Sequence, residues 1–396
     1  MTVAGPPGLL RVLVLFHEPE LLGAGNAVLN AVDDLRGFGW SVSGWLPGAG
    51  ELADAAAGRL EAVEGAPRPL AVSRRGWRLE PGVAARLGAT PGYLSAFRGA
   101  VLRLRPHVVH ANTLRTLPEA AIVRRMGLPL VFHVHELPSP SAKRTAALRL
   151  AARLADVLVC VSEAVADLVR RHAAGTPVVV VHNGVPLPDE RGDRGERPFT
   201  VGTIGTVSRL KGTDVFFRAA SRVLAEGADI RFEHAGEPSL PLDLELQEEL
   251  RSLLASPHLS GAARMLGRVE AARLLPHWDV FALPSRMDAF PLATLEAMAR
   301  GVPVVAARVG GIPEQITHLE NGVLLPPGDD RGLAEWIVRL HADPELRSRL
   351  GEAGRRRVED RFTVARQAQQ LHRAYLLALN RRFGPPRVRA SVLAAR

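Results

Sequence analysis

An alternation of two kinds of segment constrains this chain more than any other feature. Short apolar runs rich in β-branched residues recur along it, and amphipathic segments of helical length separate them. Strands that are separated by helices pair in parallel, because the crossover between parallel strands is usually a helix. The sequence therefore predicts an α/β protein with parallel sheets built from βαβ units. The strands predicted in the first half are Arg11–Phe16, Trp40–Leu46, His107–Ala111, Leu130–His135, Val157–Ser162 and Val178–His182.

The length of 396 residues exceeds one ordinary hydrophobic core and suits two domains. Segment 185–198 is rich in proline, glycine and charge, which is typical of an interdomain linker, and a second alternation follows it. We predict domains over 1–190 and 191–363, and a last helix with a basic tail over 364–396. The second-half strands are predicted at Thr200–Thr206, Asp229–His234, Ala263–Leu266, Val280–Pro284 and Val302–Ala306. The helices are predicted at Thr213–Glu226, Leu240–Ala255, Leu292–Arg300, Arg331–Ala342, Pro344–Asp360 and Val364–Arg382.

Composition excludes several classes of protein. Hydrophobic residues make up 47% and charged residues 23%, the balance of a water-soluble globular protein. No run approaches the roughly 20 apolar residues of a membrane-spanning helix. Segment Leu9–Phe16 reads as a first strand and not as a secretion signal, so we expect a cytoplasmic protein. The single cysteine, Cys160, excludes an internal disulfide framework and a cysteine-based zinc cage, and its apolar neighbours predict a buried thiol.

The positive charge is distributed unevenly. The formal net charge is +9, yet only Lys143 and Lys211 are lysines, so the excess of arginine resembles a general compositional bias and predicts no nucleic-acid partner. After Asp360 the chain has no acidic residue. Such a tail is suited to peripheral contact with anionic lipid at the inner face of a membrane, although a solvated tail is the commoner outcome. Its arginines are Arg361, Arg366, Arg373, Arg381, Arg382, Arg387, Arg389 and Arg396.

Two glycines follow the first predicted strand. Gly23 and Gly25 precede a helix start, where backbone amides are able to approach a diphosphate. The full Gly-x-Gly-x-x-Gly spacing is absent, so a turn that only caps the helix is the alternative.

A second loop carries two cations. Segment Gly205–Gly212 follows a strand and leads into a helix, and it contains Arg209 and Lys211. A diphosphate leaving group needs cations where negative charge develops. Because arginine fills nearly every other basic position, a lysine directly before a glycine indicates a specific role. A solvated surface pair is the alternative.

Two acids stand close together in segment 283–306. Asp288 comes just before a predicted helix, and Glu296 lies about one turn inside it, so both can face one edge. Glu296 has only apolar neighbours, among which an unpaired charge is costly.

These motifs resemble the large family of retaining glycosyltransferases with the GT-B fold, of the family 4 type. The most specific match is an acid, seven residues and a second acid, followed by Ala-Met-Ala-x-Gly-x-Pro-Val-Val, over 288–305. The resemblance extends from Arg11 to about Arg382. It implies two Rossmann-like domains whose parallel sheets face across a cleft, with a C-terminal helix that crosses back onto the first domain. Supporting matches are Gly205 with Arg209 and Lys211, His182–Val185, Gly310–Glu314 and Asn321–Gly322.

The resemblance also implies roles for individual residues. Glu296 would bind the ribose hydroxyls of a nucleotide, and Arg209 and Lys211 would hold its diphosphate. His135 matches the family's histidine near the reacting sugar. The residues that would face the donor sugar and phosphates are Asp288 and the backbone of Ala289, Phe290, Leu292 and Ala293, with Gly205, Gly23 and Gly25 beside the nucleotide. Weaker candidates at the edge of His135 are Glu136, His110 and Asn112.

The implied reaction is a retaining transfer from a UDP- or GDP-linked sugar to a saccharide, a lipid-linked or a small-molecule hydroxyl acceptor. The product would belong to a surface polysaccharide, a glycolipid or another glycoconjugate. The acceptor would attack from the face that the diphosphate leaves, without a protein nucleophile. Cations and a helix N-terminus near Leu292 would stabilise the leaving group, so we expect neither metal nor cofactor. Loops over 46–83 would set the acceptor, and the protein would be a monomer or a homodimer.

Two departures from the family pattern leave alternatives open. Asp288 stands where the family usually has glutamate, and Ala289 stands where glycine is usual. The shorter acid puts the donor in doubt and keeps open a catalytically silent sugar-nucleotide-binding protein. A nucleotide-sugar epimerase or a phosphorylase on the same fold is a second alternative. A dinucleotide oxidoreductase fits poorly, because its glycine fingerprint is incomplete.

Overall fold

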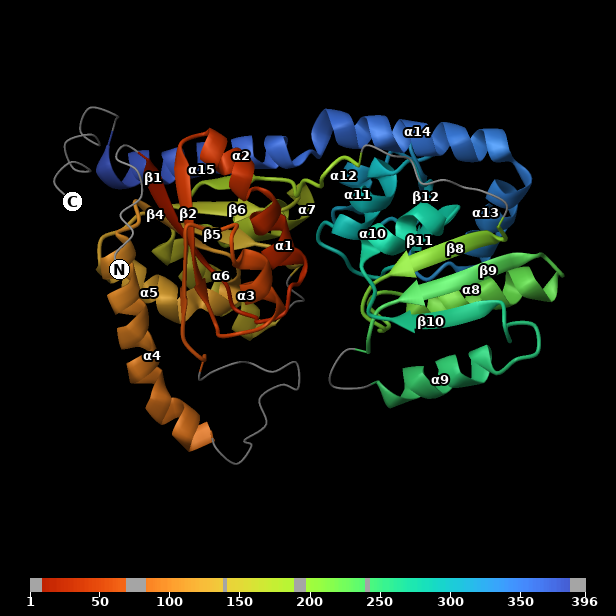
Figure 1. Ribbon diagram of the computed structural model, residues 1–396, viewed down its shortest axis with the longest axis horizontal. Helices are drawn as coiled ribbons and strands as arrows, with labels where there is room; N and C mark the ends of the chain where they lie inside the picture. Colours follow the sequence, from red (N-terminus) through yellow and green to blue (C-terminus); the bar gives the residue numbers. More distant parts are fainter. Residues whose placement is uncertain (1–8, 69–82, 138–140, 189–196, 239–242, 385–396) are drawn as a thin grey trace. The chain divides into compact units, whose positions relative to one another are not determined.

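The computed structural model describes residues 9–68, 83–137, 141–188, 197–238 and 243–384. The chain divides into two compact units (Figure 1). Unit 1 comprises Met1–Gly184 with Val364–Arg396, and unit 2 comprises Val185–Thr363. Three regions named above lie outside the described residues, at least in part: the centre of the linker, the tail from residue 385, and residues 69–82 of the predicted acceptor loops.

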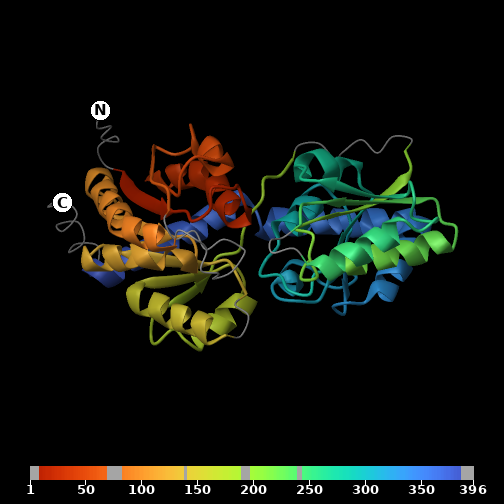
Figure 2. The same cartoon turned by 90° about the horizontal axis from the view of Figure 1, so that it is seen from below.

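Unit 1 is a seven-stranded parallel sheet in the order β3-β2-β1-β4-β5-β6-β7. Helices cover both faces, with α2 and α15 on one face and α4, α5 and α6 on the other, as Figures 1 and 2 show. The strands are β1 Leu10–Leu15, β2 Trp40–Leu46, β3 Ala62–Gly65, β4 Val108–Ala111, β5 Leu130–Val134, β6 Val157–Cys160 and β7 Val178–Val180. The helices are α1 Gly23–Asn30, α2 Val32–Gly37, α3 Glu51–Ala56, α4 Val83–Leu104, α5 Leu117–Arg125, α6 Ala142–Leu154, α7 Glu163–Arg170 and α15 Val364–Phe383, with a 3-10 turn at Leu114–Thr116.

Helix α15 completes the core of unit 1 although it comes from the far end of the chain. Its residues Leu371, Tyr375 and Leu379 are fully buried against strand residues such as Val14 and Val159. The Trp40 indole also donates a hydrogen bond to His372 Nδ1 at 2.9 Å. The C-terminal helix that the family resemblance implies for the first domain is therefore confirmed.

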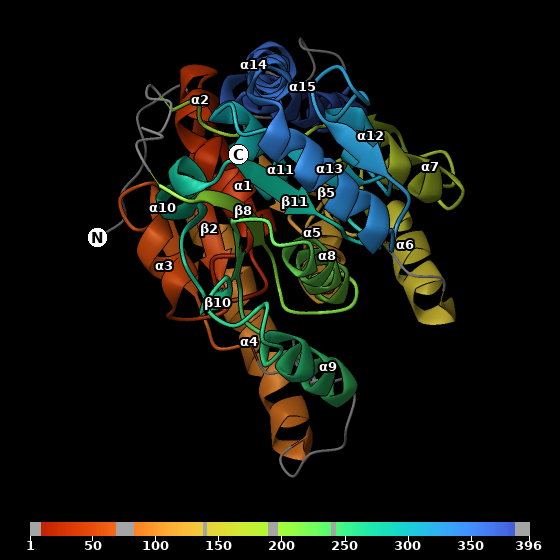
Figure 3. The same cartoon turned by 90° about the vertical axis from the view of Figure 1, so that its right-hand side faces the viewer.

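Unit 2 is a six-stranded parallel sheet in the order β10-β9-β8-β11-β12-β13. Helices α8 and α9 cover one face and α10, α11 and α14 the other, and α13 packs beside α8 (Figures 1 and 3). The strands are β8 Phe199–Ile204, β9 Ile230–Ala235, β10 Ala263–Gly267, β11 Val280–Leu283, β12 Val304–Ala307 and β13 Val323–Leu325. The helices are α8 Thr213–Ala225, α9 Leu244–Leu254, α10 Ala271–Leu274, α11 Leu292–Ala299, α12 Ile312–Gln315, α13 Asp330–Ala342 and α14 Pro344–Arg361, with a 3-10 turn at Leu275–His277.

The predicted α/β class with two parallel sheets is confirmed, and two short strands were missed. Strand β3 alternates between half-buried and exposed residues at the edge of its sheet, so it lacks the apolar run that marks a central strand. Strand β13 has three residues, too few to form a recognisable pattern. The Cys160 thiol is buried as predicted, and burial raises its pKa to about 12. In the described part of the chain no helix is both long and apolar enough to cross a membrane.

Each sheet reverses its strand order at one point. The reversal lies between β1 and β4 in unit 1 and between β8 and β11 in unit 2. Loops that leave the carboxyl ends of two such strands diverge to opposite faces and leave a crevice in which ligands of doubly wound proteins bind. The residues that follow these four strands are therefore the first place to look for a site in either unit.

Candidate active site

The loop between β8 and α8 is held in a tight turn by its own polar groups. The Lys211 amide donates to Ser208 Oγ at 3.2 Å, and the Ser208 amide donates to Thr213 Oγ1 at 3.1 Å. Gly212 has a φ of 71°, and a Cβ there would lie 2.0 Å from the carbonyl oxygen of Pro284. Only glycine therefore lets this loop rest against the residues that follow β11.

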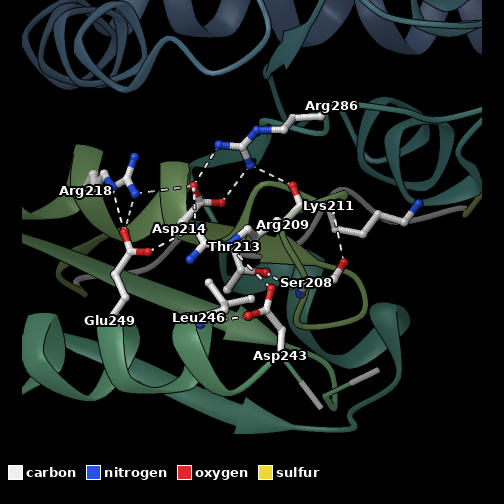
Figure 4. Close-up of polar contacts among 10 residues, drawn as sticks. All are labelled: Ser208, Arg209, Lys211, Thr213, Asp214, Arg218, Asp243, Leu246, Glu249 and Arg286. Atoms are coloured by element: carbon white, nitrogen blue, oxygen red, sulfur yellow. Dashed lines mark hydrogen bonds and ion pairs between the residues drawn. The ribbon is translucent and has the colours of Figure 1, made fainter. Parts of the chain in front are cut away.

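An ion pair between a buried acid and a partly exposed arginine holds the same two loops together (Figure 4). Both terminal guanidinium nitrogens of Arg286 donate to the fully buried carboxylate of Asp214 at 2.7 Å, and Arg286 also donates to the Arg209 carbonyl at 2.6 Å. Burial acts to raise the pKa of Asp214, but the hydrogen bonds and charge of Arg286, with the charge of Arg218, outweigh it and leave this pKa below its ordinary value. The loop that carries Arg209 and Lys211 is thus fixed relative to the loop that carries Asp288.

Lys211 and Asp288 form the central contact of this edge. The Lys211 ammonium lies 2.6 Å from Asp288 Oδ2, and the Asp288 residue is 8% exposed. The Ser285 hydroxyl lies 3.5 Å from the same oxygen. The shorter acid at position 288 therefore places its charge directly on the lysine that was predicted to bind a diphosphate.

Arg209 is balanced by acids of a different segment. Its guanidinium lies 3.1 Å from Glu249 on α9 and 3.4 Å from Asp243, the residue that caps that helix. Arg218 on α8 donates to the same Glu249 at 2.8 Å. Figure 4 shows these charges side by side along the edge. Arg209 therefore already has carboxylate partners in this structure, and its side chain is partly exposed.

The start of α11 offers backbone donors to the same edge. Its N-cap, Pro291, provides no side-chain hydrogen bond, and in the described chain the amides of Leu292 and Ala293 donate to no other residue. Unpaired amides at a helix N-terminus favour anions. Burial raises the pKa of Glu296, against the opposing effect of Arg300. Ala289 and Phe290 are both buried.

The corresponding edge of unit 1 carries the uncharged imidazole of His135, with the buried His133 beside it. His135 Nε2 donates to Asn112 Oδ1 at 2.8 Å, and Asn112 Nδ2 donates to the carbonyl of Ala24 at 3.0 Å. The rings of His133 and His135 lie in tilted contact, with centroids 3.9 Å apart and an interplanar angle of 39°. Burial is the largest cause that lowers the pKa of His135 to about 3, with further contributions from His110 and His17. His135 is therefore neutral at ordinary pH.

His110 lies below this edge and not on it. Its ring is fully buried, shares a 2.8 Å hydrogen bond with the Tyr375 hydroxyl of α15, and shares a 3.1 Å hydrogen bond with His133 Nδ1. Burial lowers its pKa to about 3. The prediction that His110 lines the edge is wrong, because the side chain points into the core. Glu136, by contrast, is exposed.

The predicted position of the two glycines also needs correction. Gly23 and Gly25 lie within the first turn of α1 and do not precede it. A Cβ on Gly25 would lie 3.2 Å from the side chain of Leu52, so close packing contributes to the need for glycine there. Ala24, between the two, provides the carbonyl that holds Asn112.

Comparisons with known proteins decide the family. Residues 22–188 match the model described as "Glycosyltransferase Family 4", and residues 198–343 match the one described as "Glycosyl transferases group 1". The chain is 30% identical over 332 residues to D-inositol 3-phosphate glycosyltransferase of Saccharomonospora viridis, an alignment that covers 74% of this chain and 76% of the relative. The chain belongs to the family 4 glycosyltransferases.

This glycosyltransferase also shares 37% identity over 124 residues with N-acetyl-alpha-D-glucosaminyl L-malate synthase of Bacillus anthracis, over 31% of this chain and 32% of the relative. Among solved structures it resembles Anabaena HepE in complex with UDP-glucose, with a TM-score of 0.76 and 20% identity, over 98% of this chain and 100% of that one. Sucrose-phosphate synthase from Thermosynechococcus elongatus gives a TM-score of 0.72 and 19% identity over the same shares. These likenesses confirm the GT-B fold, and the enzyme is a transferase of the EC 2.4 class.

The predicted site residues of the glycosyltransferase fall into two groups. Those of unit 2 follow the two strands at the reversal of its sheet, and His135 with Asn112 occupies the carboxyl edge of unit 1. Sequence reasoning missed Asp214, Arg286 and Glu249. The signal that marks Asp214 in retrospect is an acid in the first turn of a helix, directly before the apolar run Val215–Phe217. The unit 2 group comprises Gly205, Arg209, Lys211, Asp288, Ala289, Phe290, Leu292, Ala293 and Glu296.

Proposed function

We propose that this enzyme transfers a sugar from a nucleoside diphosphate sugar to a hydroxyl acceptor and retains the anomeric configuration. One observation carries the proposal. Lys211 with Asp288, and the N-terminus of α11 with Glu296, follow the two strands at which the sheet of unit 2 reverses its order. A cation and unpaired amides suit a diphosphate, and a carboxylate one helical turn further on suits ribose hydroxyls.

We propose a UDP- or GDP-linked donor. HepE, which shares the fold, was solved with UDP-glucose, and this favours a uridine nucleotide. The related enzymes are named for inositol 3-phosphate and malate, which favours an acceptor that is a small hydroxylated molecule. Saccharide and lipid-linked acceptors, as in surface polysaccharide or glycolipid synthesis, belong to the same proposal.

In the proposed reaction the protein contributes charge and position and no nucleophile. Lys211 and the α11 amides stabilise the departing diphosphate, while the acceptor hydroxyl attacks from the face that the diphosphate leaves. In the described part of the chain no group of three or more histidine, cysteine or acidic side chains is arranged to hold a metal ion. We propose that transfer proceeds without metal, so that excess chelator leaves the rate unchanged.

A thermal-shift screen of the full chain against UDP, GDP, ADP and CDP tests the donor site, because a ligand that binds only the folded state raises the unfolding temperature. One nucleotide should raise it clearly, and Glu296→Gln should lose most of that rise. Glu335→Gln, an exposed change on α13, is the matched control and should keep it.

The preferred nucleotide then defines the donor sugars for a transfer assay. Product formed with the donor's own anomeric configuration, seen by proton NMR, supports the reaction. An inverted product would refute retention. Equal thermal shifts in the wild type and in Glu296→Gln would remove Glu296 from the nucleotide site.

A further inference from the structure

The hydrogen bonds of Asn112 determine which nitrogen of His135 carries the proton. A carbonyl oxygen only accepts, so the Asn112 atom 3.0 Å from the Ala24 carbonyl is the amide nitrogen. The amide oxygen of Asn112 must then face His135 Nε2, at 2.8 Å. Because that oxygen also only accepts, His135 Nε2 carries the hydrogen, and a neutral His135 keeps its lone pair on Nδ1.

The Nδ1 atom of His135 remains open to a ligand. No other residue in the described part of the chain forms a hydrogen bond with this nitrogen. Because it is not one of the buried side-chain nitrogens that lack a partner, it reaches solvent. The ring cannot turn freely, because the tilted ring of His133 contacts it with centroids 3.9 Å apart and Asn112 holds Nε2 by a hydrogen bond. Asn112 itself is 1% exposed and therefore fixed.

We propose that Asn112 is a positioning residue that presents His135 to the substrate as a neutral acceptor at Nδ1. The group that it recognises is a hydroxyl, which donates to Nδ1; a carboxylate or phosphate oxygen is disfavoured because it has no proton to donate. This inference rests on the proposed function for the identity of the substrate. The tautomer itself does not depend on that function.

The protonation state of the His135 ring depends on its contact with Asn112 and on the titratable groups around it. The titratable groups near its ring are His17 with Glu18 on the loop after β1, His110 on β4, His133 on β5 and the adjacent, exposed Glu136. A carboxylate at position 112 would face the Nε2 hydrogen and favour the imidazolium. An apolar side chain there would leave both tautomers accessible.

The first test uses the full chain labelled with ¹⁵N-histidine, and His135→Gln identifies the His135 signals. At neutral pH the wild type should show Nε2 protonated and Nδ1 unprotonated. Asn112→Leu should show a mixture of tautomers, whereas Asn112→Asp should keep Nε2 protonated and raise the pKa of His135. If Asn112→Leu keeps the wild-type tautomer, or Asn112→Asp leaves the His135 titration in place, the proposal is overturned.

The second test measures transfer with the donor that the nucleotide screen selects. Asn112→Leu should lower kcat/KM about tenfold. Asn112→Asp should recover most of it at high pH and lose it as pH falls through the raised pKa of His135, because imidazolium has no acceptor. Thr113→Val, a change of the neighbouring buried residue that caps the next turn, is the control. An equal loss in Thr113→Val, or no recovery in Asn112→Asp, contradicts the proposal.

The two tests fail separately. If no donor supports transfer, the proposed function fails and the ¹⁵N result still decides whether Asn112 sets the tautomer. If transfer proceeds and the ¹⁵N signals do not respond to position 112, only the role of Asn112 fails.

Discussion

The carboxyl edges of the two sheets carry side chains of different chemical character. In unit 2 the edge consists of paired full charges, with Lys211 on Asp288 and Arg209 on Glu249. In unit 1 the edge carries the neutral imidazole of His135, which is hydrogen-bonded to the amide of Asn112. An edge with exchangeable ion pairs can accept an anion, whereas an edge with fixed neutral acceptors suits hydroxyl groups. The comparison shows that two parallel sheets of the same general kind can carry different chemistry at their carboxyl edges.

Removal of the Lys211 ammonium should have the largest effect. Lys211→Ala should lower kcat about 100-fold to 1,000-fold, because a preorganised group that stabilises the leaving charge is lost. Steady-state release of nucleoside diphosphate measures this. Lys143→Ala changes the other lysine of the chain, on α6, and should leave kcat unchanged. If Lys211→Ala retains wild-type turnover, charge on the unit 2 edge does not drive the reaction.

The buried Asp214–Arg286 pair should show the next largest effect, on stability. Asp214→Asn should lower the free energy of unfolding by about 2–3 kcal/mol, because Arg286 loses a charged partner but is partly exposed. Urea denaturation checks the value. Asp330→Asn breaks the more exposed contact with Arg222 and should cost clearly less than Asp214→Asn, because solvent screens an exposed ion pair. Equal costs for the two variants would show that the buried pair gives unit 2 no special rigidity.

The neutral histidines of unit 1 should produce the smallest effect, in the response to acid. The pKa of His110 is lowered to about 3, so between its ordinary value and 3 the unfolded chain binds a proton that the folded chain does not. Stability is therefore lost as pH falls below about 6.5, by about 1 kcal/mol between pH 6.5 and 5.5 for this residue.

The variant His110→Gln isolates that contribution. Its free energy of unfolding, measured at several pH values, should fall less steeply with acid than that of the wild type. His258→Gln changes an exposed imidazole in unit 2 and serves as control, with the wild-type slope expected. An unchanged slope in His110→Gln would mean that His110 takes up its proton in the folded state.

Local pattern was sufficient to predict the fold class and most of the strands. The runs at Trp40–Leu46 and Val280–Leu283 are apolar because parallel strands are covered on both faces. The motif from Asp288 to Glu296 was visible because both acids belong to one short segment. The edge strand β3 was not predicted, because one of its sides faces solvent and it therefore lacks a continuous apolar run.

Contacts between distant positions could not be predicted in this way. Asp214 and Arg286 are 72 positions apart, and His110 and Tyr375 are 265 apart. The sequence around one member of each pair does not indicate which distant residue it contacts. The burial of His110 follows from the packing of α15 on β4, and the correction of the glycines follows from the exact residue at which α1 begins.

The attachment of α15 to unit 1 has a consequence for biosynthesis. A ribosome releases residues 1–184 long before it makes Leu371, Tyr375 and Leu379, which fill the apolar layer above β4, β5 and β6. Unit 1 is thus the first to emerge and the last to complete its core. Until α15 is made, the apolar face of its sheet that α15 covers stays exposed. Nascent chains should consequently depend on chaperones, and a protein that stops at Thr363 should aggregate even though all of unit 2 is present.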